Sequence, residues 1–280
     1  LSAMIPKAGA EFYYSKKAFG KSIGFFTAWL LMLAGFVSAA TVALGFGGYL
    51  QALSNFPQIL GAIGVLVFST FVIWKGIKQS TGIAGIMTLV EALGLAIIIA
   101  VGLQSMFSFE FLQKAFDFSS FSRIALVQGA ALVFFAFIGF EEIARLSEET
   151  KNPGKNIPKA LMIAILVSTI LYVLVSLSAL SVLGPELLSA SKAPLGAVAG
   201  MALGSSAFAV LAVIALISTA STVLLILLGT SRIIYGVAED NELPHIIARI
   251  DRKTSTPVIA LFVALVFSIG LVVISEAFNT

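Results

Sequence analysis

The residues best suited to do chemistry lie between Phe134 and Ala160, where the sequence reads FFAFIGFEEIARLSEETKNPGKNIPKA. Apolar residues run up to Gly139, the carboxylates Glu141 and Glu142 follow, and a charged loop leads into the next apolar run. Glycine costs about 1 kcal/mol in a helix interior, and lipid tolerates unpaired backbone groups only where they line a cavity. The pattern predicts a membrane helix interrupted near Gly139, with carbonyls freed to bind a small molecule. A glycine that only lets two helices pack closely is the alternative.

A second candidate is Glu91, inside the apolar run IMTLVEALGLAIII. It follows Ile83 by eight residues, about 12 Å along a helix axis, and so lies near the middle of a membrane. A charged acid is costly there, so we expect Glu91 to face the bundle interior, to carry a proton, or to be paired. It either binds and releases a proton or makes a structural hydrogen bond to a hydroxyl of the run ALISTASTVLL. Those hydroxyls, which also suit ion coordination or simple helix packing, belong to Ser218, Thr219, Ser221 and Thr222.

Composition predicts an all-α integral membrane protein. Of the 280 residues, 59% are hydrophobic and 11% charged, and the mean hydropathy of +1.06 lies outside the range of soluble domains. A helix needs about 20 apolar residues to cross the hydrocarbon layer. Seven runs come near that length or exceed it, at residues 22–50, 59–74, 83–103, 124–143, 160–183, 207–237 and 258–274.

Several classes of function lack the residues they need. The absence of cysteine excludes disulfides and thiol chemistry, and a single histidine, His245, excludes a histidine metal cluster. We see no Ser/His/Asp arrangement and no phosphate-binding glycine loop, so the sequence is not that of an enzyme. A seven-helix receptor or retinal protein is the natural rival, but the last apolar run has no lysine for a Schiff base. A channel would need a filter sequence or rings of charge, which are missing.

The basic residues predict the orientation of the spans. If residues 1–21 are cytoplasmic, then of the 17 Lys and Arg residues only Lys114, Arg123 and Lys192 lie outside. This agrees with the positive-inside rule. We therefore expect a multi-pass protein of the cell membrane whose C-terminal end is extracellular.

Three blocks of the sequence resemble the amino acid–polyamine–organocation superfamily of permeases. They are MIPKAGAEFYYSKKAFGKSIGFFTAWLL from Met4, the block from Phe134 described above, and TSRIIYGVAEDNELPHIIARIDRKTSTP from Thr230. In family terms the seven spans are helices 3 to 9. The chain would then be a single truncated permease domain, residues 1–280, in which helix 1, most of helix 2 and helices 10 onward are absent.

This resemblance implies a partial leucine-transporter-type fold, with two inverted repeats of five helices and a broken helix 6. The residues that match the unwound segment are Phe135, Ala136, Phe137, Ile138 and Gly139. Their carbonyls would accept hydrogen bonds from a substrate ammonium, Phe135 would be an aromatic gate, and Ala136 and Ile138 would limit the side chain to a small neutral one. Plain lipid or helix contact is the alternative for the phenylalanines.

The resemblance also implies secondary active transport of amino acids by alternating access. We expect proton-coupled symport, with H⁺ rather than Na⁺ as coupling ion, no cofactor, no nucleic acid, and an amino acid and the lipid bilayer as partners. In several proton-coupled relatives a lysine stands where this chain has Glu91. Glu141 matches a family acid with a role in coupling or gating, although an ion pair with Arg145 is equally open. The alternatives are an amino acid/polyamine exchanger of the same superfamily and a receptor-like protein.

Overall fold

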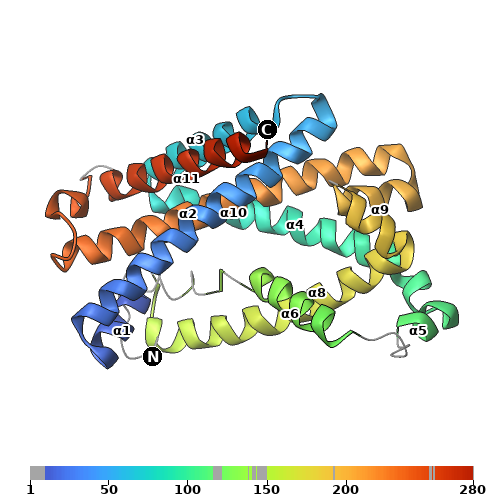
Figure 1. The fold of residues 1–280 in the computed structure, drawn as a ribbon, viewed down its shortest axis with the longest axis horizontal. Helices are drawn as coiled ribbons and strands as arrows, with labels where there is room; N and C mark the ends of the chain where they lie inside the picture. The colour runs from blue at the N-terminus through green and yellow to red at the C-terminus, as the bar shows by residue number, and fades with distance from the viewer. Residues whose placement is uncertain are drawn as a thin grey trace.

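The computed structural model describes residues 10–115, 122–137, 139, 140, 143, 150–191, 193–251, 254 and 256–279. Within these ranges every regular element is a helix, which confirms the predicted all-α class. Figure 1 shows two groups of helices on either side of α4 (Ile77–Met106). One group holds α2 (Lys21–Ser54), α3 (Gln58–Trp74), α10 (Ser205–Glu239) and α11 (Val258–Asn279). The other holds α6 (Arg123–Ala136) and α8 (Pro153–Ala190).

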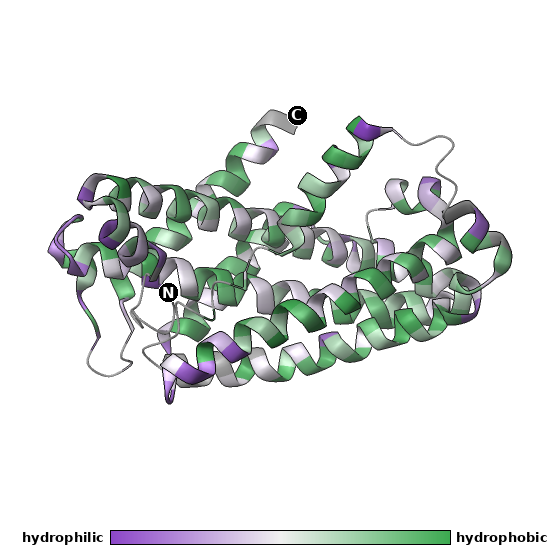
Figure 2. Ribbon diagram, turned by 90° about the horizontal axis from the view of Figure 1, so that it is seen from below, coloured by the Kyte–Doolittle hydropathy of each residue, from purple (hydrophilic) through white to green (hydrophobic). Residues whose placement is uncertain are grey.

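The predicted spans correspond closely to these helices. Among the described residues, five helices are long and apolar enough to cross a membrane: α2, α4, α8, α10 and α11. The remaining two predicted spans are shorter helices, α3 with 17 residues and α6 with 14. In α8 the helical conformation is interrupted at Gly184 (φ 74, ψ 165), so the span ends next to residue 183, where hydropathy placed its end. Apolar residues cover the middle of the bundle and hydrophilic ones gather at its ends (Figure 2).

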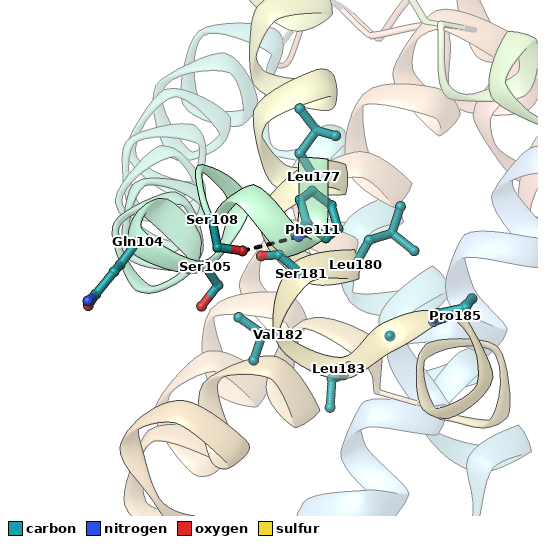
Figure 3. A pocket seen from close by; sticks show the side chains of 11 residues that line it. Gln104, Ser105, Ser108, Phe111, Leu177, Leu180, Ser181, Val182, Leu183 and Pro185 are labelled. Carbon is teal, nitrogen blue, oxygen red and sulfur yellow. Dashed lines mark hydrogen bonds between the residues drawn. The ribbon is translucent and has the colours of Figure 1, made fainter. Parts of the chain in front are cut away.

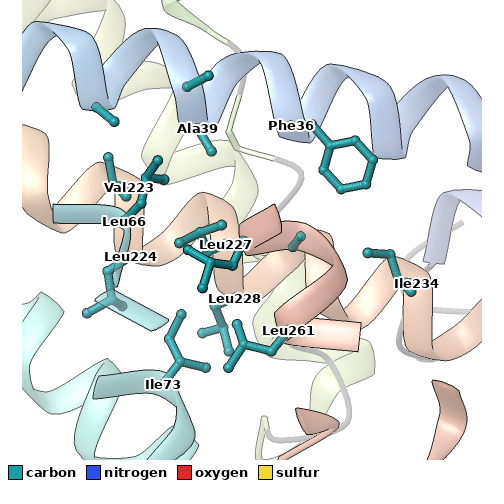
Figure 4. Close-up of a cluster of buried hydrophobic side chains, with 14 of the residues drawn as sticks. Phe36, Ala39, Leu66, Ile73, Val223, Leu224, Leu227, Leu228, Ile234 and Leu261 are labelled. Atoms are coloured by element: carbon teal, nitrogen blue, oxygen red, sulfur yellow. The ribbon is translucent and has the colours of Figure 1, made fainter. Parts of the chain in front are cut away.

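We call α2, α3, α10 and α11 the scaffold, because they share the main cluster of buried apolar side chains (Figure 4). Leu66, Leu227 and Leu261 are almost fully buried in it. Since lipid is as apolar as leucine, membrane helices associate through close packing of small residues. Gly35 provides such a contact, because a Cβ at this position would collide with the side chain of Thr230. Small residues such as Gly35 therefore allow the backbones of the scaffold helices to approach closely.

The second group is joined to the scaffold through α4. A smaller apolar cluster contains Ile98 of α4, Ala179 of α8, Val198 of α9 (Pro194–Leu203) and Leu211 of α10. Close approach again depends on glycine. On α4, Gly94 faces Ile214 of α10, and Gly102 faces the buried Ser178 of α8, with no room for a Cβ at either position. Helix α4 is thus held between the scaffold and α8.

We predict that Gly102→Ala destabilises the protein by about 1–3 kcal/mol, because the new methyl group must displace Ser178 in a packed interface. Gly64→Ala is the matched control: Gly64 is an exposed residue of α3 with no atom within 4 Å of an added Cβ. This change should be neutral, or stabilising by up to about 1 kcal/mol. The midpoint of thermal inactivation in detergent compares the two variants. Equal midpoints would contradict the close α4–α8 contact.

Four short elements were not predicted: α1 (Ala10–Phe19), α5 (Phe109–Ala115), α9 and the 3₁₀ helix η2 (His245–Ala248). Local signals for two of them are present in the sequence. Ser108 precedes α5, and its Oγ accepts a hydrogen bond of 3.3 Å from the Phe111 N–H, as an N-cap residue does. Helix α9 begins at Pro194 and ends before Gly204, whose φ of 93° favours glycine. These helices are too short for the hydropathy criterion used for spans.

Candidate functional site

The fourth predicted span is interrupted where the sequence indicated. Helix α6 ends at Ala136, and the Phe137 N–H donates a tight-turn hydrogen bond to the Phe134 carbonyl (3.0 Å). Gly139 then adopts φ 123°, a conformation that residues with a side chain rarely adopt. Nothing lies within 4 Å of the place where a Cβ would be. Glycine is therefore required here for the course of the backbone, and close packing, the alternative reading, does not explain it. The predicted loss of helical geometry near Gly139 is confirmed.

A tyrosine of α8 contacts the interrupted segment. The Tyr172 hydroxyl donates a hydrogen bond of 2.6 Å to the Ala136 carbonyl, and its ring meets the Phe137 ring edge-on at 5.2 Å. The Ala136 carbonyl thus accepts a hydrogen bond from outside its own helix, as expected where a helix ends. A cavity of about 270 Å³ adjoins this contact, lined by Ala136, Phe137, Gly139, Phe140, Ile143, Ala164, Ile165, Ser168 and Tyr172.

The sequence analysis missed Tyr172, although a signal for it exists. It is a single phenol within the apolar run STILYVLVS, and the hydroxyl of a buried tyrosine usually finds a hydrogen-bond partner. A phenol at membrane depth therefore indicates an acceptor on a neighbouring helix. Hydropathy cannot say which neighbour provides the acceptor, because that depends on how α6 and α8 pack.

The structure brings Glu91 together with two of the four predicted hydroxyl residues. Glu91, Ser218 and Thr219 line one cavity of about 140 Å³ between α4 and α10. Tyr49 of α2 and Leu195 of α9 complete two of its walls. Glu91 is half-buried and faces the interior of the bundle, as an acid in this position must. Tyr49 was not predicted, since α2 is distant in sequence from both other helices.

Hydrogen bonding within α10 determines what this cavity offers. The Thr219 hydroxyl donates to the Ala215 and Leu216 carbonyls at 2.8 and 3.1 Å. Its hydrogen is committed to the helix, so toward the cavity the oxygen can act only as an acceptor. Ser218 and Tyr49 add two further hydroxyl groups to the lining of the Glu91 cavity.

The other predicted site residues lie elsewhere or outside the described part of the chain. Ser221 is buried within α10, and the Thr222 hydroxyl donates to the Ser218 carbonyl at 3.0 Å. Neither is among the described residues that line the Glu91 cavity. The described residues contain no group of three or more acidic or histidine side chains that could hold a metal ion. The predicted site residues Ile138 and Glu141 lie outside the described residues, and Phe135 is described only as part of α6.

Tyr172 on α8 interacts electrostatically with Glu91 on α4, although it is not among the described residues that line the Glu91 cavity. The Tyr172 hydroxyl donates to the Ala136 carbonyl. The helices that carry these residues, α4 and α8, pack against each other along the Gly102–Ser178 contact. The Tyr172 side chain therefore interacts both with the carboxyl group on α4 and with the end of α6.

A third cavity, of about 980 Å³, is lined by parts of α4, α5 and α8, and the residues that line it include none of the predicted site residues (Figure 3). Ser105, Ser108 and Ser181 supply its hydroxyl groups. Two of these hydroxyl groups form hydrogen bonds with the backbone: Ser108 caps α5, and the Ser181 hydroxyl donates to the Ser178 carbonyl at 2.9 Å. Gln104 and Ser105 are the other polar residues that line this cavity.

A bundle of membrane-length helices, in which one helix ends beside a cavity, is the class of protein that the described residues define. The chain belongs to the amino acid permease family, whose model matches residues 1–280. It is 26% identical to the branched-chain amino acid permease BcaP of Bacillus subtilis over 92% of this chain and 59% of the relative. It is 28% identical to the methylthioribose transporter of the same organism (91% and 59%). It is 29% identical to the human large neutral amino acids transporter small subunit 2 (100% and 54%). The chain thus spans less than two thirds of the length of the curated relatives it matches.

Proposed function

We propose that the full-length gene product is a secondary active transporter that takes up neutral amino acids with protons across the cell membrane by alternating access. The observation that carries this proposal is the end of α6 at Ala136, followed by left-handed backbone at Gly139, beside a cavity that both residues line. Two relatives named as transporters of branched-chain or large neutral amino acids support the substrate class.

The chemistry of recognition follows from the freed carbonyls. An amino acid ammonium loses water when it enters the membrane and needs acceptors in exchange, which the end of α6 provides. The segment of residues 135–139 carries apolar side chains and no charge. Phe135 is proposed as the gate, and Ala136 and Ile138 as the residues that limit side-chain size. A charged substrate side chain would have no partner on this segment, so the segment favours neutral substrates.

Proton coupling is assigned to Glu91 with Ser218 and Thr219. The Thr219 hydroxyl donates its hydrogen to the Ala215 and Leu216 carbonyls, so its oxygen would serve a protonated Glu91 as an acceptor. Tyr172 gives a change in the charge of Glu91 a route to the interrupted helix. Glu141 remains a proposed coupling or gating residue, and its ion pair with Arg145 remains the alternative.

Substrate choice is tested with the purified full-length protein in liposomes. Labelled neutral, cationic and acidic amino acids are offered separately, together with methylthioribose, which a relative is named for. We expect saturable uptake of one or more neutral amino acids and no uptake of the charged ones. Saturable uptake of methylthioribose alone would contradict the proposed substrate class. Counterflow without any net uptake would identify an exchanger instead.

We predict that Tyr172→Phe lowers the rate of neutral amino acid uptake by up to about tenfold, because it removes one hydrogen bond worth about 0.5–1.5 kcal/mol to the end of α6. Tyr235→Phe is the control, since the Tyr235 hydroxyl bonds to Glu239 within α10 (3.0 Å) and lies outside both cavities. Initial rates in liposomes compare the two variants. Equal rates would remove Tyr172 from the site.

A further inference from the structure

Helix α1 contacts both groups of helices at the end of the bundle where α2 begins and α10 ends (Figure 1). We propose that α1 is a latch of the transporter: it stays fixed to the scaffold and holds the beginning of α8 through Tyr14, a contact that opens when this end of the protein opens. The positive-inside pattern assigns this end to the cytoplasm. The inference rests on the proposed transport function for its role, whereas the contacts themselves do not depend on that function.

The attachment of α1 to the scaffold is extensive. Phe12 is fully buried in the scaffold cluster, and the Tyr13 hydroxyl donates to the Gly236 carbonyl of α10 at 3.5 Å. Gly20, with φ 90°, lies between the two helices, and α1 packs back on α2. Gly24 of α2 allows this packing, because an added Cβ would lie 2.7 Å from the Lys16 Cβ.

Charges strengthen this attachment. The Lys16 ammonium pairs with Asp240, and also lies 3.7 Å from a Glu242 oxygen, which Lys21 approaches to 3.2 Å. The side chains of Asp240 and Glu242 are only 25% and 11% exposed, so this network is less screened than an ordinary surface pair. The hydrogen bond to Asp240 raises the pKa of Lys16. Its contribution is therefore complete below about pH 10 and is lost only as the pH rises through that raised pKa.

The contact with α8 is small by comparison. The Tyr14 ring packs on Ile157, in the first turns of α8, together with Leu161 and Ile143. Among the described residues this contact is apolar. The Tyr14 hydroxyl is buried and has no hydrogen-bond partner among them, so this part of the chain gives the contact no directional bond.

The Tyr14 contact also reaches the interrupted segment. Ile143, which packs on Ile157 beside Tyr14, lines the cavity that contains Ala136 and Gly139. A displacement of the backbone at the end of α6 would therefore reach the Tyr14 contact directly, through Ile143. In the described part of the chain, the contact of α1 with α8 is apolar, whereas its contacts with the end of α10 are both polar and charged. We therefore expect the α8 side to separate and the α10 side to remain closed.

Pairs of introduced cysteines test directly whether α1 must separate from α8 for transport, since the chain contains no cysteine of its own. Tyr14→Cys/Ile157→Cys bridges the latch to α8, and Lys16→Cys/Asp240→Cys is the matched control within the scaffold side. Any cysteines elsewhere in the full-length protein are first replaced by serine. After bridging with a short, reducible bifunctional thiol reagent, we expect the first pair to lose at least 90% of amino acid uptake and to recover it on reduction. The second pair should retain uptake within about twofold.

Full uptake with the first pair bridged would overturn the latch proposal. Loss of uptake when the second pair is bridged would also overturn it. Distances between spin labels at the same positions in liposomes give a readout that needs no substrate. We expect two populations for the 14/157 pair and one for the 16/240 pair. A single population for both pairs also overturns the proposal. Absence of uptake in the unbridged parent protein, with two label populations at 14/157, would instead reject the transport function and leave the moving contact established.

Discussion

Replacing Glu91 by glutamine is expected to abolish accumulation of substrate driven by a proton gradient while leaving exchange of substrate across the membrane. Glutamine keeps the shape of the side chain and its ability to hydrogen-bond to Ser218 or Thr219, the hydroxyl residues of the same cavity. It cannot bind and release a proton, so the cycle loses its coupling. The end of α6 is untouched by the change. We therefore expect at least a tenfold loss of gradient-driven accumulation, and counterflow within about twofold of the parent protein.

Both activities are measured side by side in the same liposomes. Glu186→Gln is the control, because Glu186 is an exposed acid near the C-terminal end of α8 and lines neither cavity. Undiminished accumulation in Glu91→Gln would return Glu91 to a structural role. Equal loss of both activities, together with a broadened size-exclusion profile, would show that the substitution disrupts folding.

Gly139→Leu is expected to abolish uptake altogether while the protein is still inserted and folded. The φ of 123° at this position is costly for leucine, so the segment must either strain or continue as helix. Continuing the helix would bury the carbonyls that the proposed substrate needs. Steric exclusion is a minor effect, because a Cβ at this position meets no atom within 4 Å.

Gly129→Leu is the matched control for this experiment. Gly129 lies inside α6 and has equally open space around it, but its backbone is helical. We expect Gly129→Leu to keep uptake within about threefold of the parent, and Gly139→Leu to fall to the background of empty liposomes. Comparable uptake by the two variants would show that the interruption at Gly139 is not needed for transport.

The sequence was sufficient to predict the spans and the interruption because both depend on local properties. A run of apolar residues is apolar wherever it packs, and the glycine at 139 is costly in any helix. The end of the span near Gly184 was predicted for the same reason. Glu91 was expected to face the interior because an acid near mid-membrane has few other places to go.

The features that were missed depend on packing between distant segments. Tyr172 gains its importance from the Ala136 carbonyl on another helix, and Tyr49 reaches the Glu91 cavity from α2. Neither relation leaves a periodic pattern in the sequence. Which hydroxyl residues of α10 reach the Glu91 cavity also depends on packing. Ser218 and Thr219 line the cavity, whereas Ser221 and Thr222 do not. Spacing along a helix could not decide this without the position of α4.

Uptake of labelled leucine by the full-length protein in liposomes tests most directly whether the protein takes up neutral amino acids with protons. Four conditions are compared: an inward proton gradient, an inward sodium gradient, both gradients, and neither. We expect accumulation above equilibrium with the proton gradient, collapse of that accumulation on adding a proton ionophore, and no effect of sodium alone. Accumulation that requires sodium and survives the ionophore would contradict this account.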